Sequence, residues 1–176
     1  GKIYVMNRIW SWLLAMSTVI CALFMTLMTV FYSSENPLTA FLNRLINFRL
    51  SYGKKGVDLF GFSLLGQYIP MIGNGGSVKE SEMYFFLDCS YMNLALQFGI
   101  VLLGIILIIC SVIGFSAIQK KNWVLLWILA VVAVQCMIEH HMMDISYNPF
   151  LWAVFADMTV KAGKRLDWKK KRKQTV

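Results

Sequence analysis

Long apolar stretches separated by short polar segments dominate the sequence. Three extended apolar runs cover residues 10–32, 84–118 and 123–141, and a shorter fourth run covers 150–160. About 20 apolar residues in an α-helix cross the ~30 Å hydrocarbon layer of a bilayer. The pattern therefore predicts an all-α, polytopic membrane protein with about four transmembrane helices.

The polar segments between these runs predict which side of the membrane each one faces. They cover residues 1–9, 33–83, 119–122, 142–149 and 161–176. The turn at 119–122 contains Lys120 and Lys121, and the last segment is a basic tail with eight lysines and arginines. Cations collect on the cytoplasmic side of membrane proteins. We therefore expect both termini in the cytoplasm, and residues 33–83 and 142–149 on the outer side.

The long outer loop, 33–83, contains its own apolar pattern. Apolar and polar positions alternate with helical spacing over Leu38–Leu50, which predicts a short amphipathic helix at the membrane surface. The apolar stretch 59–72 is broken by glycines and a proline, so a re-entrant segment is expected there instead of a span. The glycine-rich stretch 73–76 is read as a turn, since it lacks the residues of a phosphate-binding loop.

Composition and charge support a membrane protein and argue against a nucleic-acid-binding protein and against a domain held together by zinc or disulfides. The chain is 58% hydrophobic with a mean hydropathy of +0.60, above the usual range of soluble domains. Its net charge of +8 is concentrated in the basic tail, which suits contact with anionic lipid head groups better than nucleic-acid binding. The four cysteines form no CxxC pair, so neither a zinc ribbon nor a disulfide framework is indicated.

The outer loop carries a group of cations, which are uncommon on that side of a membrane. They are Arg44, Arg49, Lys54 and Lys55. The planar arginine fork binds phosphate through two parallel hydrogen bonds, so this group is a candidate site for the pyrophosphate of a lipid. The alternative is a surface helix whose arginines reach ordinary lipid phosphates.

A second group of ionisable residues lies at the outer end of the third apolar run. It consists of Glu139, His140, His141 and Asp144. If the helix continues through them, His140 and Asp144 share one face and offer an acid–base pair. The alternatives are a solvated helix end and, on a weaker signal because no HExxH pattern is present, a metal site.

A third polar group comes where the chain returns to the membrane after the outer loop. It consists of Asp88, Ser90, Tyr91 and Asn93. Asp88 is a candidate base or orienting carboxylate, but a carboxylate that caps the N-terminus of the second membrane helix is the simpler explanation.

Three stretches, in a fixed order, carry a resemblance to a known family. They are LNRLINFRL (42–50) with YG (52–53) and GFSLLGQ (61–67); Tyr84 and LDCSY (87–91) with Leu94, Gly99 and Ile100; and Glu139 with YNPFL (147–151). Together they resemble the outer loop and following helices of bacterial polysaccharide polymerases of the Wzy type, in the O-antigen polymerase and ligase superfamily. Since such polymerases have ten or more spans, the chain resembles a C-terminal portion of one, a fragment of GT-C-like architecture.

The resemblance implies a glycosyltransferase of the bacterial cytoplasmic membrane. It would join oligosaccharide repeat units carried on undecaprenyl pyrophosphate into capsular, exo- or O-antigen polysaccharide at the outer face. The implied catalytic candidates are Asp88, Glu139, His140 and His141, and the implied substrate-binding candidates are Arg49, Arg44, Lys54, Lys55 and Tyr91. The resemblance implies no metal and no other cofactor. Its expected partners are the lipid-linked oligosaccharide, membrane lipids, and a flippase and chain-length regulator of the same pathway.

Three other functions stay open at this stage. A polysaccharide ligase shares the architecture of the polymerase and differs in its acceptor. A transporter fragment is disfavoured, because transporters carry charged residues near the middle of their spans and the three long apolar runs carry none there. A non-catalytic membrane fragment is the third alternative.

Overall fold

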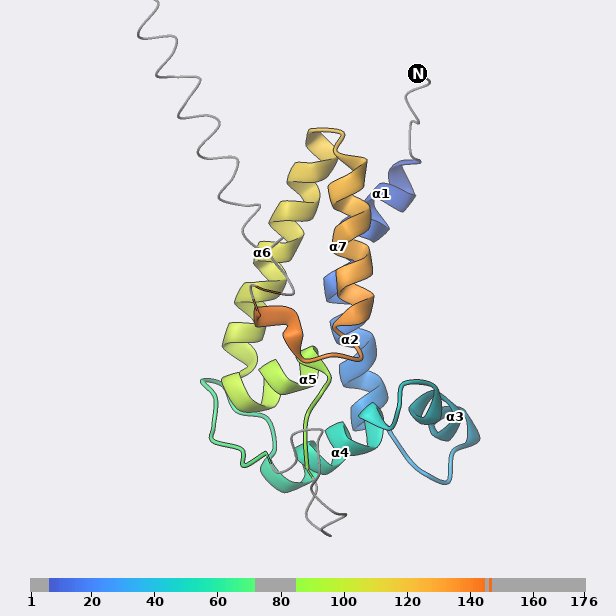
Figure 1. Ribbon diagram of the computed structural model, residues 1–176, viewed down its shortest axis with the longest axis vertical. Coiled ribbons are helices and arrows are strands. Elements are labelled where there is room, and N and C mark those ends of the chain that lie inside the picture. Colours follow the sequence, from blue (N-terminus) through green and yellow to red (C-terminus); the bar gives the residue numbers. More distant parts are fainter. Residues whose placement is uncertain (1–6, 72–84, 145, 147–176) are drawn as a thin grey trace, which may run out of the picture.

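The computed structural model describes residues 7–71, 85–144 and 146 (Figure 1). In these residues the chain is helical and contains no β-strand, which confirms the all-α prediction for this part of the molecule. The helices are α1 (Arg8–Ala15), α2 (Ser17–Val30), α3 (Pro37–Leu45), α4 (Arg49–Phe60), α5 (Ser90–Asn93), a π-helical turn (Leu94–Phe98), α6 (Ile100–Gln119), α7 (Trp123–Gln135) and a 3₁₀ turn (His141–Met143).

Of the described helices, α6 is long and apolar enough to cross a membrane by itself. Helices α1 and α2 meet the same criterion only as a pair, and they are bent by 59° at the break between them, Met16. Helix α7 is apolar but has 13 residues. The described residues therefore contain one candidate span, or two if the bent pair counts as one. The predicted fourth span, 150–160, and the basic tail lie outside the described residues.

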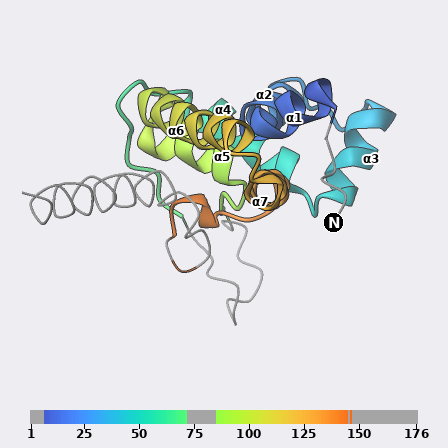
Figure 2. The same ribbon diagram turned by 90° about the horizontal axis from the view of Figure 1, so that it is seen from above.

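Helices α1, α2, α6 and α7 pack side by side as a bundle (Figures 1 and 2). Small residues lie where these helices meet: Ala15, Ala22, Ala117 and Ala133 are all at most 3% exposed. Helices α1 and α6 approach closely at Gly114 of α6, where an added Cβ would lie 2.8 Å from the carbonyl oxygen of Ala15. Small residues that let backbones approach closely are typical of helix pairs inside a membrane.

The predicted second span, 84–118, is not one continuous helix. Helix α5 and the π-helical turn are separated from α6 by Gly99, whose φ of +96° is a conformation that favours glycine. An added Cβ at Gly99 would lie 2.5 Å from the backbone of Leu64 and Gly66, so the loop after α4 packs directly against this break. Ser63 and Leu64 in that loop accept hydrogen bonds from the backbone N–H groups of the first residues of α6, which have no partner within their own helix. The predicted re-entrant segment thus includes the loop that caps α6.

The helix predicted over Leu38–Leu50 is divided into α3 and α4. Asn47 and Phe48 have φ angles of +53° and +62°, and the Phe48 N–H donates to the carbonyl oxygen of Asn43 at 2.7 Å. A left-handed residue after the last helical turn is a common way to end a helix. Helix α4 therefore starts in a new direction at Arg49 and lies across the end of the bundle, against α2 (Figure 1).

Helix α3 is amphipathic with its polar side facing inward. The buried side chains are polar: Thr39 donates to the carbonyl oxygen of Ser33 at 2.7 Å, and Asn43 donates to the Tyr32 hydroxyl at 3.1 Å. The apolar side chains Leu38, Phe41 and Leu45 are all more than 60% exposed. This is the reverse of a helix on the surface of a soluble protein.

Gly114 tests the close contact between α1 and α6. We expect Gly114→Ala to lower the free energy of unfolding by about 1–3 kcal/mol, because the new methyl group overlaps the Ala15 backbone. Gly104 is a matched control in the same helix, since an added Cβ there meets nothing within 4 Å. We expect Gly104→Ala to be neutral or to stabilise by up to ~1 kcal/mol. Thermal unfolding of both variants in lipid nanodiscs measures the difference, and equal unfolding temperatures would contradict the packing described here.

Candidate functional site

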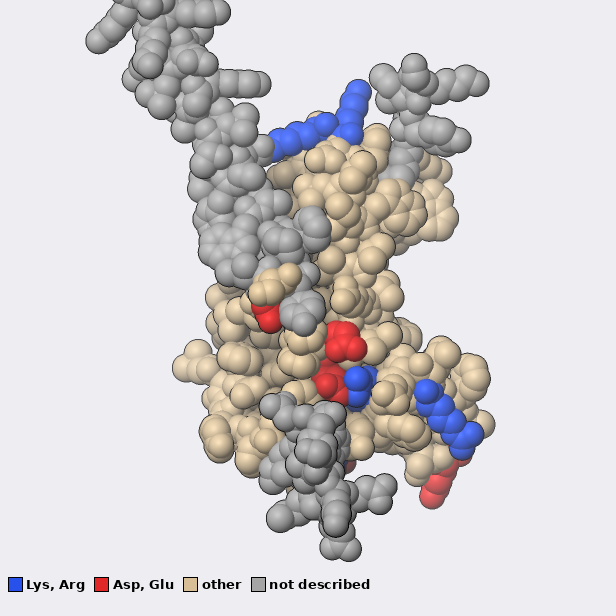
Figure 3. All heavy atoms as spheres, viewed as in Figure 1, with Lys and Arg blue, Asp and Glu red and all other residues tan. Residues whose placement is uncertain are grey.

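Three segments far apart in the sequence meet at the C-terminal end of α7. They are the start of α4, the extended segment before α5, and the residues that follow α7. Acidic and basic side chains lie side by side on this face (Figure 3). The cluster contains Arg49, Asp88, Glu139, His140 and His141, and we refer to it as the polar cluster.

Helix α5 holds the end of α7 in place. The Tyr91 hydroxyl donates to the carbonyl oxygen of Ala133 at 2.8 Å, and the Ser90 N–H donates to the carbonyl oxygen of Cys136 at 3.0 Å. The last carbonyls of a helix have no partner within it, and leaving them buried and unpaired costs ~1–3 kcal/mol each. The contacts from α5 satisfy the carbonyls of Ala133 and Cys136, and so help to fix where the chain continues after α7.

Ser90 also fixes the loop that carries the two histidines. Its hydroxyl donates to the carbonyl oxygen of Glu139 and accepts from the Met142 N–H at 3.2 Å. Ser90 is buried, with 1% of the residue's surface exposed. One buried hydroxyl thus pins the loop on both sides of His140 and His141.

Arg49 joins all three segments. Its guanidinium forms an ion pair with Asp88, and its Nε donates to the carbonyl oxygen of Ile138 at 3.0 Å. The side chains of Arg49 and Asp88 are only 14% and 16% exposed, so this pair is less screened by water than a surface ion pair. Arg49 reaches the cluster because the left-handed break at Phe48 starts α4 at this point.

Asp88 lies between the guanidinium of Arg49 and the imidazole of His140. The His140 Nδ1 is 3.8 Å from the second carboxylate oxygen of Asp88. Burial raises the pKa of the Asp88 carboxyl above its ordinary value, with a smaller contribution from Glu139, while Arg49 and His140 oppose the shift. A carboxylate with a raised pKa is a stronger base, provided that it is still ionised at the working pH.

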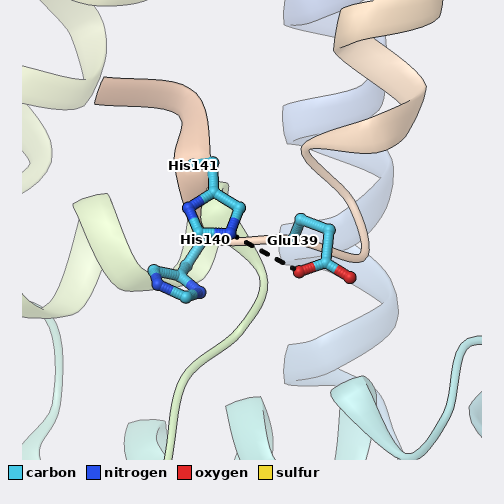
Figure 4. A group of neighbouring side chains, drawn as sticks. All are labelled: Glu139, His140 and His141. Carbon is cyan, nitrogen blue, oxygen red and sulfur yellow. Dashed lines mark ion pairs between the residues drawn. The ribbon is translucent and has the colours of Figure 1, made fainter. Parts of the chain in front are cut away.

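Glu139, His140 and His141 form a compact group of possible ligands (Figure 4). One ligand atom from each lies within 4.8 Å of the other two, and the His141 Nε2 is 4.0 Å from a carboxylate oxygen of Glu139. The two imidazole rings are tilted against each other with centroids 4.2 Å apart, and the ring of Phe86 meets His140 edge-on.

A pocket of about 390 Å³ opens beside the two histidines. Its walls are Ser90, Asn93, Leu94, Gln97, Phe98, His140, His141, Met142, Met143 and Asp144. The amide nitrogen of Asn93 donates to the carbonyl oxygen of Leu87, but its buried Oδ1 has no hydrogen-bond partner among the described residues. A buried acceptor without a partner is costly, so this atom favours a ligand that brings a donor.

The other predicted substrate-binding residues lie elsewhere. Arg44 is exposed at the end of α3, Lys54 pairs with Asp58 of its own helix at 3.0 Å, and the Lys55 Nζ lies 5.9 Å from the ring centroid of Phe85. Among the described cations of the loop, Arg49 alone reaches the polar cluster. Tyr91 is fully buried and its hydroxyl donates to a carbonyl of α7, which gives it a packing contact, while its assignment to substrate binding stays a prediction.

Two expectations about local geometry also need correction. His140 and Asp144 do not share a helical face, because α7 ends at Gln135 and a 3₁₀ turn begins at His141. Asp88 does not cap a helix: the N-cap of α5 is Cys89, and the Asp88 carboxylate faces Arg49 and His140 instead. Sequence reasoning named Ser90 without finding that it organises the site. It also named Asn93, but no pattern in the sequence marks the side-chain oxygen of Asn93 as unpartnered.

The role of Ser90 can be tested by deleting its hydroxyl. We expect Ser90→Ala to lower the free energy of unfolding by about 1–3 kcal/mol, because the buried Met142 N–H and Glu139 carbonyl lose their shared partner. The matched control is Ser111→Ala in α6, whose hydroxyl only bonds the carbonyl of Leu107 one turn earlier, and we expect a change within ~0.5 kcal/mol. Thermal unfolding in nanodiscs compares the two, and a Ser90→Ala protein as stable as the Ser111→Ala protein would remove Ser90 from this role.

No protein-family model, curated protein or solved structure matches the chain.

Proposed function

We propose that the chain is part of a membrane glycosyltransferase that polymerises oligosaccharide repeat units carried on undecaprenyl pyrophosphate. One observation carries the proposal: Arg49, Asp88 and His140 are in contact, although they are 39 and 52 residues apart along the chain. Arg49 and Asp88 come from two of the stretches on which the family resemblance rests, and His140 follows Glu139 of the third. Such convergence is what a shared active site requires.

Arg49 is the proposed binding group for the donor pyrophosphate. A guanidinium has five N–H donors, and the bonds to Asp88 and Ile138 engage Nη1 and Nε, so further donors remain for phosphate oxygens. Asp88 and Ile138 hold the Arg49 guanidinium in place. It can therefore stabilise the transition state, in which negative charge builds up on the leaving pyrophosphate.

Asp88 is the proposed base, and His140 supports it. The acceptor hydroxyl gives its proton to the Asp88 carboxylate as its oxygen bonds the anomeric carbon of the donor. The bond from that carbon to the pyrophosphate oxygen breaks, and undecaprenyl pyrophosphate leaves with the electron pair. Binding of pyrophosphate to Arg49 weakens the Arg49–Asp88 pair, which raises the basicity of Asp88 when the donor is in place.

We further propose that the chain lies in the bacterial cytoplasmic membrane with four spans and both termini in the cytoplasm. The α6–α7 turn, which carries Lys120 and Lys121, and the start of α1 lie at the end of the bundle away from α3, α4 and α5 (Figure 1). This separation agrees with a cytoplasmic turn and an outer-side polar cluster. The exposed apolar side of α3 suits a helix lying in the outer interface, where Arg44 reaches lipid phosphates.

The proposal is tested in a bacterium whose surface polysaccharide depends on this gene. We expect Arg49→Ala to reduce polymerisation by about 10²–10³-fold, as loss of a transition-state donor does, so that the polysaccharide ladder disappears and lipid-linked single repeats accumulate. Arg49→Lys keeps the charge but loses the planar fork of the guanidinium, so we expect it to retain little of the polymerisation activity. The gel is read beside the membrane expression level of each variant.

Arg44→Ala is the matched control, since it removes an arginine from the neighbouring helix without touching the polar cluster. We expect its ladder to be retained. An unchanged ladder in Arg49→Ala at normal expression would refute the assignment of Arg49. Loss of the transfer of finished chains, with intact polymerisation, would instead identify the related ligase.

A further inference from the structure

The side chains of Glu139, His140 and His141 offer one carboxylate and two imidazoles to a single point. Ligand atoms held ~2.1 Å from a tetrahedral metal ion lie roughly 3.4 Å apart. The His141 Nε2 and the Glu139 oxygen are 4.0 Å apart, which is too long for a hydrogen bond but close to the spacing of two ligands on one ion. The third ligand atom lies within 4.8 Å of both.

The surroundings hold these ligands in place from two sides. Ser90 fixes the backbone at Glu139 and Met142, which brackets the two histidines. Asp88 faces the Nδ1 of His140, and a carboxylate on one imidazole nitrogen keeps the lone pair of the other nitrogen available for a metal. Both features are typical of supported metal sites and do not depend on the distances between the ligands themselves.

We infer that Glu139, His140 and His141 form a binding site for a divalent transition-metal ion of the Zn²⁺, Co²⁺ or Mn²⁺ type. Two imidazoles and one carboxylate suit these ions, whereas Mg²⁺ and Ca²⁺ prefer sites made of oxygen alone. The inference goes beyond the proposed function, which uses Arg49, Asp88 and His140 and needs no metal.

An ion at this site would have a coordination position that no protein ligand occupies. Three protein ligands leave at least one position of the ion free, as in catalytic zinc sites and unlike closed structural ones. His140 and His141 form one wall of the pocket that also contains Asn93 and Gln97, so the free position faces that pocket. An ion there would bind an oxygen ligand from the pocket, such as a water or a hydroxyl.

Cobalt titration tests the site directly, because tetrahedral or five-coordinate Co²⁺ with nitrogen ligands absorbs visible light. The full chain is purified with an affinity tag free of histidine, treated with EDTA, and placed in phosphatidylcholine nanodiscs. The chain contains two histidines, so these are its complete imidazole content. We expect one Co²⁺ per chain, with new visible absorption that Zn²⁺ abolishes by competition.

Three variants and one control decide between this site and weak surface binding. We expect Glu139→Gln and His141→Ala to abolish the absorption, and Asp88→Asn to weaken binding about 10–100-fold, as loss of an outer-shell partner does. The control is Glu35→Gln, an exposed acid in the connection to α3, which leaves binding unchanged. Circular dichroism confirms the fold of each variant.

Two results would overturn the inference: no absorption beyond that of free Co²⁺, or an unchanged spectrum in His141→Ala. Arg49→Ala separates this inference from the proposed function. It removes the group assigned to pyrophosphate and is expected to keep one Co²⁺ per chain. Polymerisation and cobalt binding can therefore fail independently of each other.

Discussion

The structure depends on how the carbonyl groups at the C-terminal end of α7 find partners. The following residues pair with several of these groups, and Tyr91 and Ser90 supply donors to the carbonyls of Ala133 and Cys136, while Arg49 supplies one to Ile138 just beyond the helix. All three come from segments that precede α7 in the sequence. Satisfying one helix end therefore draws α4, α5 and the loop after α7 together, and the polar cluster forms at that junction.

The apolar pattern of the sequence was sufficient to predict a helical protein and the bodies of α2, α6 and α7. It did not predict the breaks at Met16, Asn47–Phe48 and Gly99, since an apolar run looks the same whether the helix continues or bends. These breaks are decided by packing: Gly99 adopts a positive φ where the loop at Leu64 and Gly66 approaches the backbone. Contacts between distant segments of this kind leave no periodic signal in the sequence.

Residue type was enough to predict which residues are candidates for the site, but not which of them contact one another. Arg49, Asp88, Glu139, His140 and His141 stand out because ionisable groups are rare in so apolar a chain. Arg44 lies apart from Arg49 because the left-handed turn before Arg49 starts α4 there and leaves Arg44 on α3. Lys54 is on the same helix as Arg49 but pairs with Asp58. Residue type says equally little about Tyr91, because a tyrosine suits a buried position as well as a binding site, and its contact with the Ala133 carbonyl could not be read from the sequence.

The inverted polarity of α3 has a consequence for handling the molecule outside a bilayer. Leu38, Phe41 and Leu45 present an exposed apolar strip, while the side chains of Thr39 and Asn43 are buried and hydrogen-bonded inside the protein. When the detergent around the protein is diluted, that strip is exposed to water, and two copies can bury it by packing their α3 helices against each other. The colloidal behaviour of the purified chain is then governed by one nine-residue helix as well as by the long apolar ones.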